Sequence, residues 1–175
     1  VEVAVNLSFS QIEADGFVEI AKSIFERSTV DASRIEFELT EASVLQDIRH
    51  IRKSMTSLQD LGVSFSLDDF GTGFSQLSHL TELPISVIKI DASFLAEVPH
   101  NRHQEAVCTT IIEMAGRLGM EVIAEGAETN EQIDFLRSRG CSQVQGFYYS
   151  PAIPLPQLPR FIQRQRWQRK RHLTL

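Results

Sequence analysis

This sequence has few cysteines, no net positive charge and no long apolar run. Its 175 residues include two cysteines, Cys108 and Cys141, which lie in or beside apolar segments without metal-type spacing. This usage argues against a disulfide and is typical of reduced core thiols in a cytoplasmic protein. The formal net charge of -6 argues against binding to nucleic acid polymers, although a small anion held through metal ions is compatible with it. No apolar run is long enough to span a bilayer.

The length and the opening residues bear on domain organisation. A chain of 175 residues fits one domain with a sizeable core. It begins with residue Val1, inside a strand-like alternation. Since a natural protein would begin with methionine, we expect residues 1–175 to be a single domain that lacks its N-terminal part. We expect it to be the C-terminal domain of a longer signalling protein, either cytoplasmic or the cytoplasmic part of a membrane-anchored protein.

Strand-like and helix-like segments alternate along the chain. Three of the predicted helices end at a glycine directly before the next strand, at Gly62, Gly119 and Gly140, and glycine tolerates the left-handed conformation that closes a helix. Alternation of this kind predicts parallel strands with helices packed outside them. The predicted strands are residues 1–7, 35–39, 63–67, 87–90, 121–124 and 142–144.

Two architectures fit this alternation, an open doubly wound sheet and a TIM-like (β/α)8 barrel. The polar residues at the strand ends favour the barrel, because there the carboxyl ends of all strands meet at one central mouth. In an open sheet ligands gather mainly at the switch point, and polar ends along the whole sheet would have no common target. The predicted strands number six, whereas a complete barrel needs about eight.

The most informative motif is Leu67-Asp68-Asp69-Phe70-Gly71-Thr72-Gly73, in which two adjacent carboxylates end an apolar run and a glycine-rich turn follows. Adjacent carboxylates repel each other, so a soluble domain seldom places them at a buried strand end without a cation. Oxygen ligands suit hard cations such as Mg2+ or Mn2+. Two such ions about 4 Å apart can activate water and stabilise the leaving oxygen of a phosphodiester.

Further polar residues end the other strands. Lys89 is positioned to orient a water or to offset phosphate charge, and Asp91, two residues on, points the same way and is expected to fix that lysine. Singly, each residue has an ordinary structural explanation, such as a cap for Asn6 or a helix N-terminal charge for Glu38 and Glu41. Together their convergence indicates a site. The strand-end residues are Asn6, Glu38, Asp68, Lys89, Glu125 and Gln145.

These motifs resemble the EAL domain family, the bacterial cyclic di-GMP phosphodiesterases. They occur in family order and cover nearly the whole chain, so the set is far more specific than a lone glycine-rich match. The matching segments are Asn6-Leu7-Ser8, Glu38-Leu39-Thr40-Glu41, Asp68-Asp69-Phe70-Gly71-Thr72-Gly73, Lys89-Ile90-Asp91, Ala124-Glu125-Gly126-Ala127-Glu128 and Gln145-Gly146.

The resemblance implies a distorted TIM barrel that hydrolyses cyclic di-GMP to linear pGpG with two Mg2+ or Mn2+ ions. It also implies a homodimer, bacterial second-messenger signalling that controls biofilm formation, and upstream sensor or GGDEF-type domains. By the same resemblance, the metal ligands are Asn6, Glu38, Asp68, Asp69 and Glu125.

The resemblance assigns roles to the remaining motif residues. Lys89 corresponds to the residue that holds the catalytic water, and Glu41 to the glutamate that steadies the loop from Asp69 to Phe74. We expect both to serve catalysis together with Asp69 and Glu125. The expected substrate-side residues are Gln145, Asp91 and Glu128.

The chain also departs from the family pattern. The Glu-x-Leu strand that names the family, with its metal-binding glutamate and phosphate-binding arginine, would precede Val1. Ala92 stands where the family usually has arginine, Gln76 where a small residue is common, and Pro151-Ala152 where a basic residue and proline are usual. None of these changes removes a metal ligand present in the chain, so turnover is expected, although residues 1–175 alone are expected to be a poor enzyme.

Two other functions fit the sequence less well. One is a catalytically silent EAL-type module that binds cyclic di-GMP and acts through a protein partner, and silent members usually lose acids that are intact here. The other is a fragment whose role is association alone. The arginine-rich tail, Arg160 to Arg171, fits a final amphipathic helix with a solvated basic face better than a contact with a partner or an anionic membrane surface.

Overall fold

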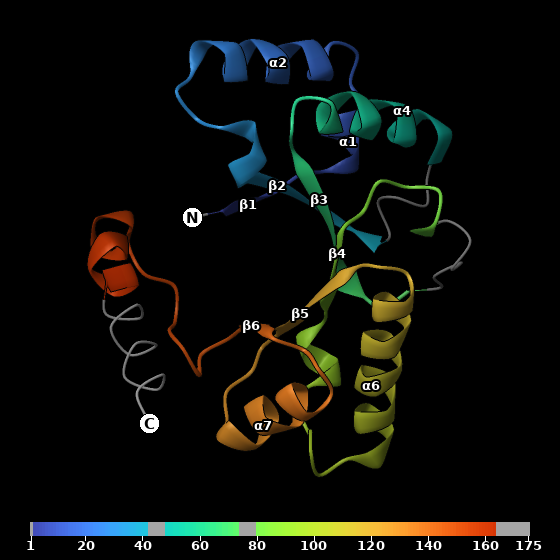
Figure 1. Ribbon diagram of the computed structural model, residues 1–175, viewed down its shortest axis with the longest axis vertical. Coiled ribbons are helices and arrows are strands. Elements are labelled where there is room, and N and C mark those ends of the chain that lie inside the picture. Colours follow the sequence, from blue (N-terminus) through green and yellow to red (C-terminus); the bar gives the residue numbers. More distant parts are fainter. Residues whose placement is uncertain (1, 42–47, 74–79, 164–175) are drawn as a thin grey trace.

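Six parallel strands in a curled sheet are the frame of the molecule (Figure 1). The computed structural model describes residues 2–41, 48–73 and 80–163. Neighbouring strands follow chain order from β1 to β6 without a reversal, which excludes the doubly wound alternative and confirms the barrel type of curl. The strands are β1 (Val3–Asn6), β2 (Ile35–Thr40), β3 (Ser64–Phe70), β4 (Val87–Ile90), β5 (Glu121–Glu125) and β6 (Gln143–Gln145).

Helices follow the strands and begin where the sequence offers caps. Ser8 and Thr129 each form a capping box, with Gln11 and Gln132 respectively, which satisfies the first free amides of α1 and α7. The predicted glycine ends are also present, since Gly62, Gly119 and Gly140 all have positive φ. The helical elements are α1 (Phe9–Glu13), α2 (Phe17–Arg27), η1 (Ala32–Arg34), α4 (Ile48–Gln59), η2 (Ala92–Phe94), α6 (Arg102–Arg117), α7 (Asn130–Ser138) and η3 (Leu155–Gln157).

The apolar core lies between the sheet and the helices. Phe37 and Phe65 are register partners on β2 and β3, and the centroids of their rings are 6.0 Å apart. Met55 and Leu58 on α4 are fully buried in the same core. Because side chains alternate along a strand, the register partners Asn6, Glu38 and Ser66 face the opposite, inner side of the curled sheet.

The two edges of the sheet are open. Within the described residues β1 and β6 each pair with one strand, whereas closure of a TIM-type barrel requires about eight strands. Every residue of β1 is exposed, including Val3 at 50% and Val5 at 41%. The described chain therefore forms an incomplete barrel. No helix in the described ranges is long and apolar enough to cross a membrane.

Both cysteines are free and buried, as predicted. Burial raises the pKa of the Cys108 thiol to about 11 and also raises that of Cys141. Since the thiolate is the reactive form, we predict that neither cysteine reacts with Ellman's reagent at pH 8 in the native protein, and that both react in guanidinium chloride. Rapid release of thionitrobenzoate before denaturation would contradict this placement.

Candidate functional site

Four adjacent strands bring charged side chains together at their carboxyl ends. The Nζ atom of Lys89, on β4, lies 2.8 Å from Glu38 Oε1 on β2, 3.1 Å from Asp68 Oδ1 on β3 and 2.7 Å from Glu125 Oε1 on β5. The predicted convergence of strand ends thus holds for these four residues. One ammonium group joins three carboxylates at the mouth of the partial barrel.

This cluster is largely shielded from solvent. The Lys89 side chain is 4% exposed, and the three carboxylates are between 11% and 17% exposed. Burial by itself would lower the pKa of Lys89, but the hydrogen bonds to Glu125 and Glu38 outweigh it and raise that pKa above its ordinary value. Lys89 therefore stays charged at neutral pH although it is buried.

The backbone at Asp69 is unusual. Asp69 has a φ of 55° and is the one non-glycine residue with positive φ in the described part of the chain. The pairing of β3 with β4 also shifts register between Leu67 and Phe70. Burial, followed by the charges of Asp68 and Asp91, raises the pKa of Asp69, while Lys89 opposes this. Left-handed non-glycine residues cluster at functional sites, where surrounding contacts hold the strain.

Glu41 holds the turn that follows Asp69. It is 4% exposed, and its Oε2 accepts a hydrogen bond of 3.0 Å from the Gly71 amide. A Cβ atom at Gly73 would lie 2.7 Å from Glu41 Oε1, so any side chain at this position would push the carboxylate aside. These contacts support the expected role of Glu41 in steadying the loop, for the part of the loop that ends at Gly73. Phe74, the far end of the predicted loop, and Gln76 lie outside the described residues.

The other predicted residues lie around this cluster. Asn6 pairs in register with Glu38, and Gln145 pairs with Glu125, and both are exposed. Glu128 lies just before α7, where its amide donates to Gln132. Asp91 accepts hydrogen bonds from the amide and hydroxyl of Ser93, so its observed contacts cap η2, whereas the ion pairs of Lys89 go to the three acids above.

Sequence reasoning missed Glu36 on the inner face. It is half-buried, and burial raises its pKa, with the neighbouring Glu38 adding to the effect and Ser66 opposing it. Its position two residues before Glu38 on the same strand was the available signal. The inner face of this sheet therefore carries an acidic group, Glu36, further from the mouth than the strand-end residues.

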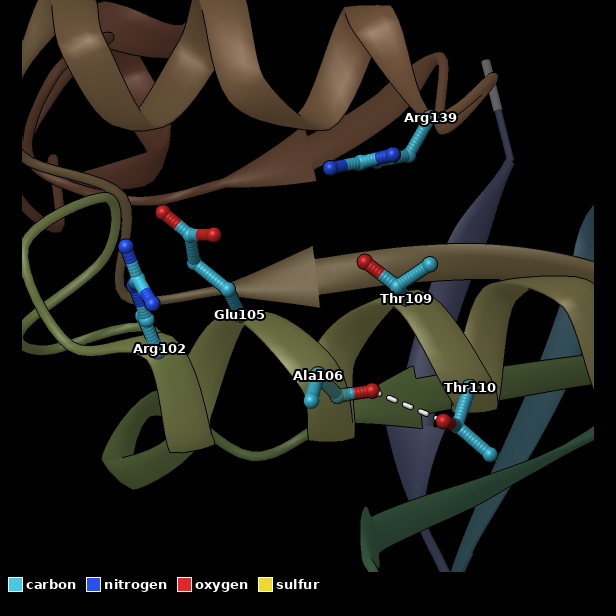
Figure 2. Close-up of a pocket in the computed structure, with 6 residues that line it drawn as sticks. All are labelled: Arg102, Glu105, Ala106, Thr109, Thr110 and Arg139. Atoms are coloured by element: carbon cyan, nitrogen blue, oxygen red, sulfur yellow. Dashed lines mark hydrogen bonds between the residues drawn. The ribbon is translucent and has the colours of Figure 1, made fainter.

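An open pocket of about 440 Å³ lies elsewhere, on the outer side between α6 and the end of α7. Figure 2 shows Arg139, from the segment after α7, opposite the residues of α6 that line the pocket. None of the predicted site residues lines it, so we place the candidate site at the strand ends. The pocket residues are Arg102, Glu105, Ala106, Thr109, Thr110 and Arg139.

The strand-end residues suit a hard divalent cation. Asp68 Oδ1 is buried and has no hydrogen-bond partner, and it lies 3.1 Å from Lys89 Nζ in an ion pair. A buried carboxylate oxygen with unused lone pairs is an available ligand. Among the described residues no three acidic, histidine or cysteine side chains form a ready metal-binding group. The three carboxylates converge on the Lys89 ammonium instead.

The fold and the site together define a TIM-type barrel protein with an acidic strand-end site. Comparison with known families identifies the class of barrel, because residues 1–152 match the model of the EAL domain. The chain belongs to the EAL domain family.

Relatives and solved structures agree with this membership. The chain is 36% identical over 165 residues to the cyclic di-GMP phosphodiesterase NbdA of Pseudomonas aeruginosa, covering 94% of this chain and 21% of NbdA. It matches the PaMucR phosphodiesterase in complex with c-di-GMP at a TM-score of 0.85 and 35% identity, covering 90% of this chain and 64% of that one. The chain thus spans about a fifth of the length of NbdA.

A further solved structure carries metal. Klebsiella pneumoniae BlrP1, with manganese and cyclic di-GMP, matches at a TM-score of 0.79 and 28% identity, covering 86% of this chain and 38% of that one. BlrP1 is also known as a complex with calcium and cyclic di-GMP. Divalent metal is therefore bound by members of this fold family.

Proposed function

We propose that this chain forms the larger part of a metal-dependent phosphodiesterase domain that hydrolyses cyclic di-GMP to linear pGpG. The observation that carries the proposal is the convergence of Glu38, Asp68 and Glu125 with Lys89 at the barrel mouth. The family match supports the substrate, because NbdA is a cyclic di-GMP phosphodiesterase and PaMucR is solved with c-di-GMP. In the reaction water adds to one phosphorus and one ester bond breaks, which opens the ring.

The carboxylates and one amide would hold two Mg2+ or Mn2+ ions. The proposed ligands are Asn6, Glu38, Asp68, Asp69 and Glu125, which lie on or directly after β1, β2, β3 and β5. When bound, such ions supply Lewis acidity and lower the pKa of water. Asp68 Oδ1, which is buried and has no hydrogen-bond partner, is the atom in the structure that best fits this use.

Lys89 and the residues near the rim would serve the substrate. Lys89 keeps its charge at neutral pH and has three N–H donors, so it can hold a water or a phosphate oxygen once the carboxylates bind metal. Gln145 is exposed next to Glu125 and offers amide donors and acceptors. We assign Asp91 and Glu128 to the substrate side as well, with Asp91 acting from its position at the start of η2.

The proposal extends to the setting of the domain. We propose a cytoplasmic homodimer attached to upstream sensor or GGDEF-type domains. A relative supports the second part, since MucR of Pseudomonas aeruginosa is a bifunctional diguanylate cyclase and cyclic di-GMP phosphodiesterase, 35% identical over 156 residues, with 89% of this chain and 23% of MucR covered.

The test is incubation of the full-length protein with cyclic di-GMP and Mg2+, followed by chromatography of the products. Linear pGpG should accumulate, and EDTA should stop its formation. Binding of cyclic di-GMP without any hydrolysis, under Mg2+ and under Mn2+, would overturn the enzymatic proposal and favour the silent receptor.

Calcium should separate binding from turnover. Ca2+ accepts longer bonds and looser geometry than Mg2+ or Mn2+, so it should bind but misplace the water and phosphate. We expect cyclic di-GMP to bind in the presence of Ca2+, as it does in the calcium complex of BlrP1. Turnover in Ca2+ should stay near background. Calorimetry of binding and the chromatographic assay measure the two properties side by side, and equal rates in Ca2+ and Mg2+ would argue against a tightly held two-ion site.

Removing the Glu41 carboxylate should weaken catalysis without removing a metal ligand. Glu41→Ala breaks the hydrogen bond to Gly71, and loss of a residue that orients a metal ligand costs about 10–100-fold. We expect a rate decrease in that range, a higher Mg2+ requirement and altered dimerisation. Glu26→Ala, on the exposed side of α2, is the matched control, and a Glu41→Ala variant with unchanged rate and association would refute the steadying role.

A further inference from the structure

The turn after Asp69 is held from two sides at Gly71. On one side its amide donates to Glu41 Oε2 at 3.0 Å. On the other side, a Cβ atom at Gly71 would lie 3.0 Å from Cε2 and 3.3 Å from Cζ of Phe94, and 3.5 Å from Cδ1 of Ile111. The edge of the Phe94 ring therefore packs against the side of Gly71 on which a Cβ atom would lie. A larger residue at Gly71 would meet this ring and would also be strained at its φ of 96°.

Phe94 is itself held in place. It ends the short helix η2, in which the side chain of Asp91 accepts a hydrogen bond from the Ser93 amide. Its carbonyl oxygen accepts a hydrogen bond of 3.2 Å from the Cys108 thiol on α6. The carbonyl of Ser93 accepts another, of 3.0 Å, from Gln104 Nε2 on α6. Phe94 thus sits on a segment tied to α6 through two side chains and to the end of β4 through Asp91.

These contacts join two parts of the site that are far apart in the sequence. Asp68 and Asp69 lead directly into Gly71, while Lys89 leads directly into Asp91 and η2. We infer that Phe94 is a positioning residue, which sets the turn of Asp69 to Gly73 relative to Lys89 through its contact with Gly71. This inference rests on the proposed phosphodiesterase function for its kinetic consequence. Its structural consequence, the ordering of the turn, is independent of that function.

The kinetic test compares Phe94→Leu with Phe25→Leu in the full-length protein. Phe25 is a half-buried phenylalanine on α2 that packs against the same core and serves as the matched control. Phe94→Leu should lower kcat about tenfold or more and raise the Mg2+ concentration needed for half-maximal rate, with a small change in KM for cyclic di-GMP, because the change acts on transition-state geometry. Phe25→Leu should lower the melting temperature comparably and leave kcat and the Mg2+ requirement unchanged.

A second readout does not need activity. Amide hydrogen exchange of the peptide covering residues 66–73, measured without metal, should speed up about tenfold at Gly71 in Phe94→Leu and stay unchanged in Phe25→Leu. If Phe94→Leu does not fold, Phe94→Met, which keeps the bulk and removes the flat ring edge, takes its place. Faster exchange in a protein that never hydrolyses cyclic di-GMP would support the positioning role and reject the proposed function. Unchanged exchange, with or without a lower kcat, would overturn the positioning role.

Discussion

Asp68→Asn is expected to abolish hydrolysis of cyclic di-GMP while leaving the fold intact. The amide keeps the shape of the side chain but lacks the charge that binds a cation, and the oxygen concerned, Oδ1, is buried without a hydrogen-bond partner. Loss of a residue that merely orients a ligand costs about 10–100-fold, so loss of a ligand should exceed a hundredfold. Chromatography of the products formed by the full-length protein with Mg2+ measures the effect.

Asp60→Asn is the control for this substitution. Asp60 is exposed just after α4, so the same chemical change there should leave turnover and thermal unfolding near the parent values. Thermal unfolding of Asp68→Asn should also remain cooperative, since Lys89 retains its ion pairs with Glu38 and Glu125. Near-normal turnover by Asp68→Asn would refute the assignment of Asp68 as a metal ligand.

The strand order and the strand-end cluster were within reach of the sequence. Each predicted strand overlaps an observed one, as residues 87–90 do with β4 (Val87–Ile90). Buried parallel strands are short apolar runs, so a charged residue that ends such a run is conspicuous. In a parallel sheet the carboxyl ends of all strands lie along the same end of the sheet. This is why Glu38, Asp68 and Glu125 were expected near Lys89.

The local geometry within the cluster was not predictable in the same way. Strand β3 was expected to end at Leu67, but it continues to Phe70 through a register shift and a left-handed Asp69. Such a conformation depends on contacts with residues distant in sequence, here Glu41 and Phe94 on either side of Gly71. Asp91 was expected to fix Lys89, yet its short side chain reaches Ser93, two residues away, and caps η2. Periodicity and strand-end position carry no information on these choices.

The remaining large effect concerns the open edges of the barrel. Strand β1 is exposed along its whole length, and β6 is the opposite edge of the sheet. Open parallel edges present unpaired backbone groups and apolar side chains that favour association. We propose that further strands, supplied from outside residues 1–175, close this barrel and bring the glutamate of the Glu-x-Leu strand to the site. Residues 1–175 alone should then associate and turn over cyclic di-GMP more than about a hundredfold more slowly than the closed form, because the site would lack a ligand.

The experiment compares residues 1–175 with a form extended ahead of Val1 to the length of the solved relatives, of which this chain spans 64% in the PaMucR case. Light scattering should show a defined dimer for the extended form and a broad mixture of larger species for the short one. The chromatographic assay should show pGpG from the extended form alone. In the short form, Val3→Lys should reduce association by placing charge on the open edge. If residues 1–175 are monodisperse and hydrolyse cyclic di-GMP as fast as the extended form, six strands suffice for the site, and the role given to the missing ligand is wrong.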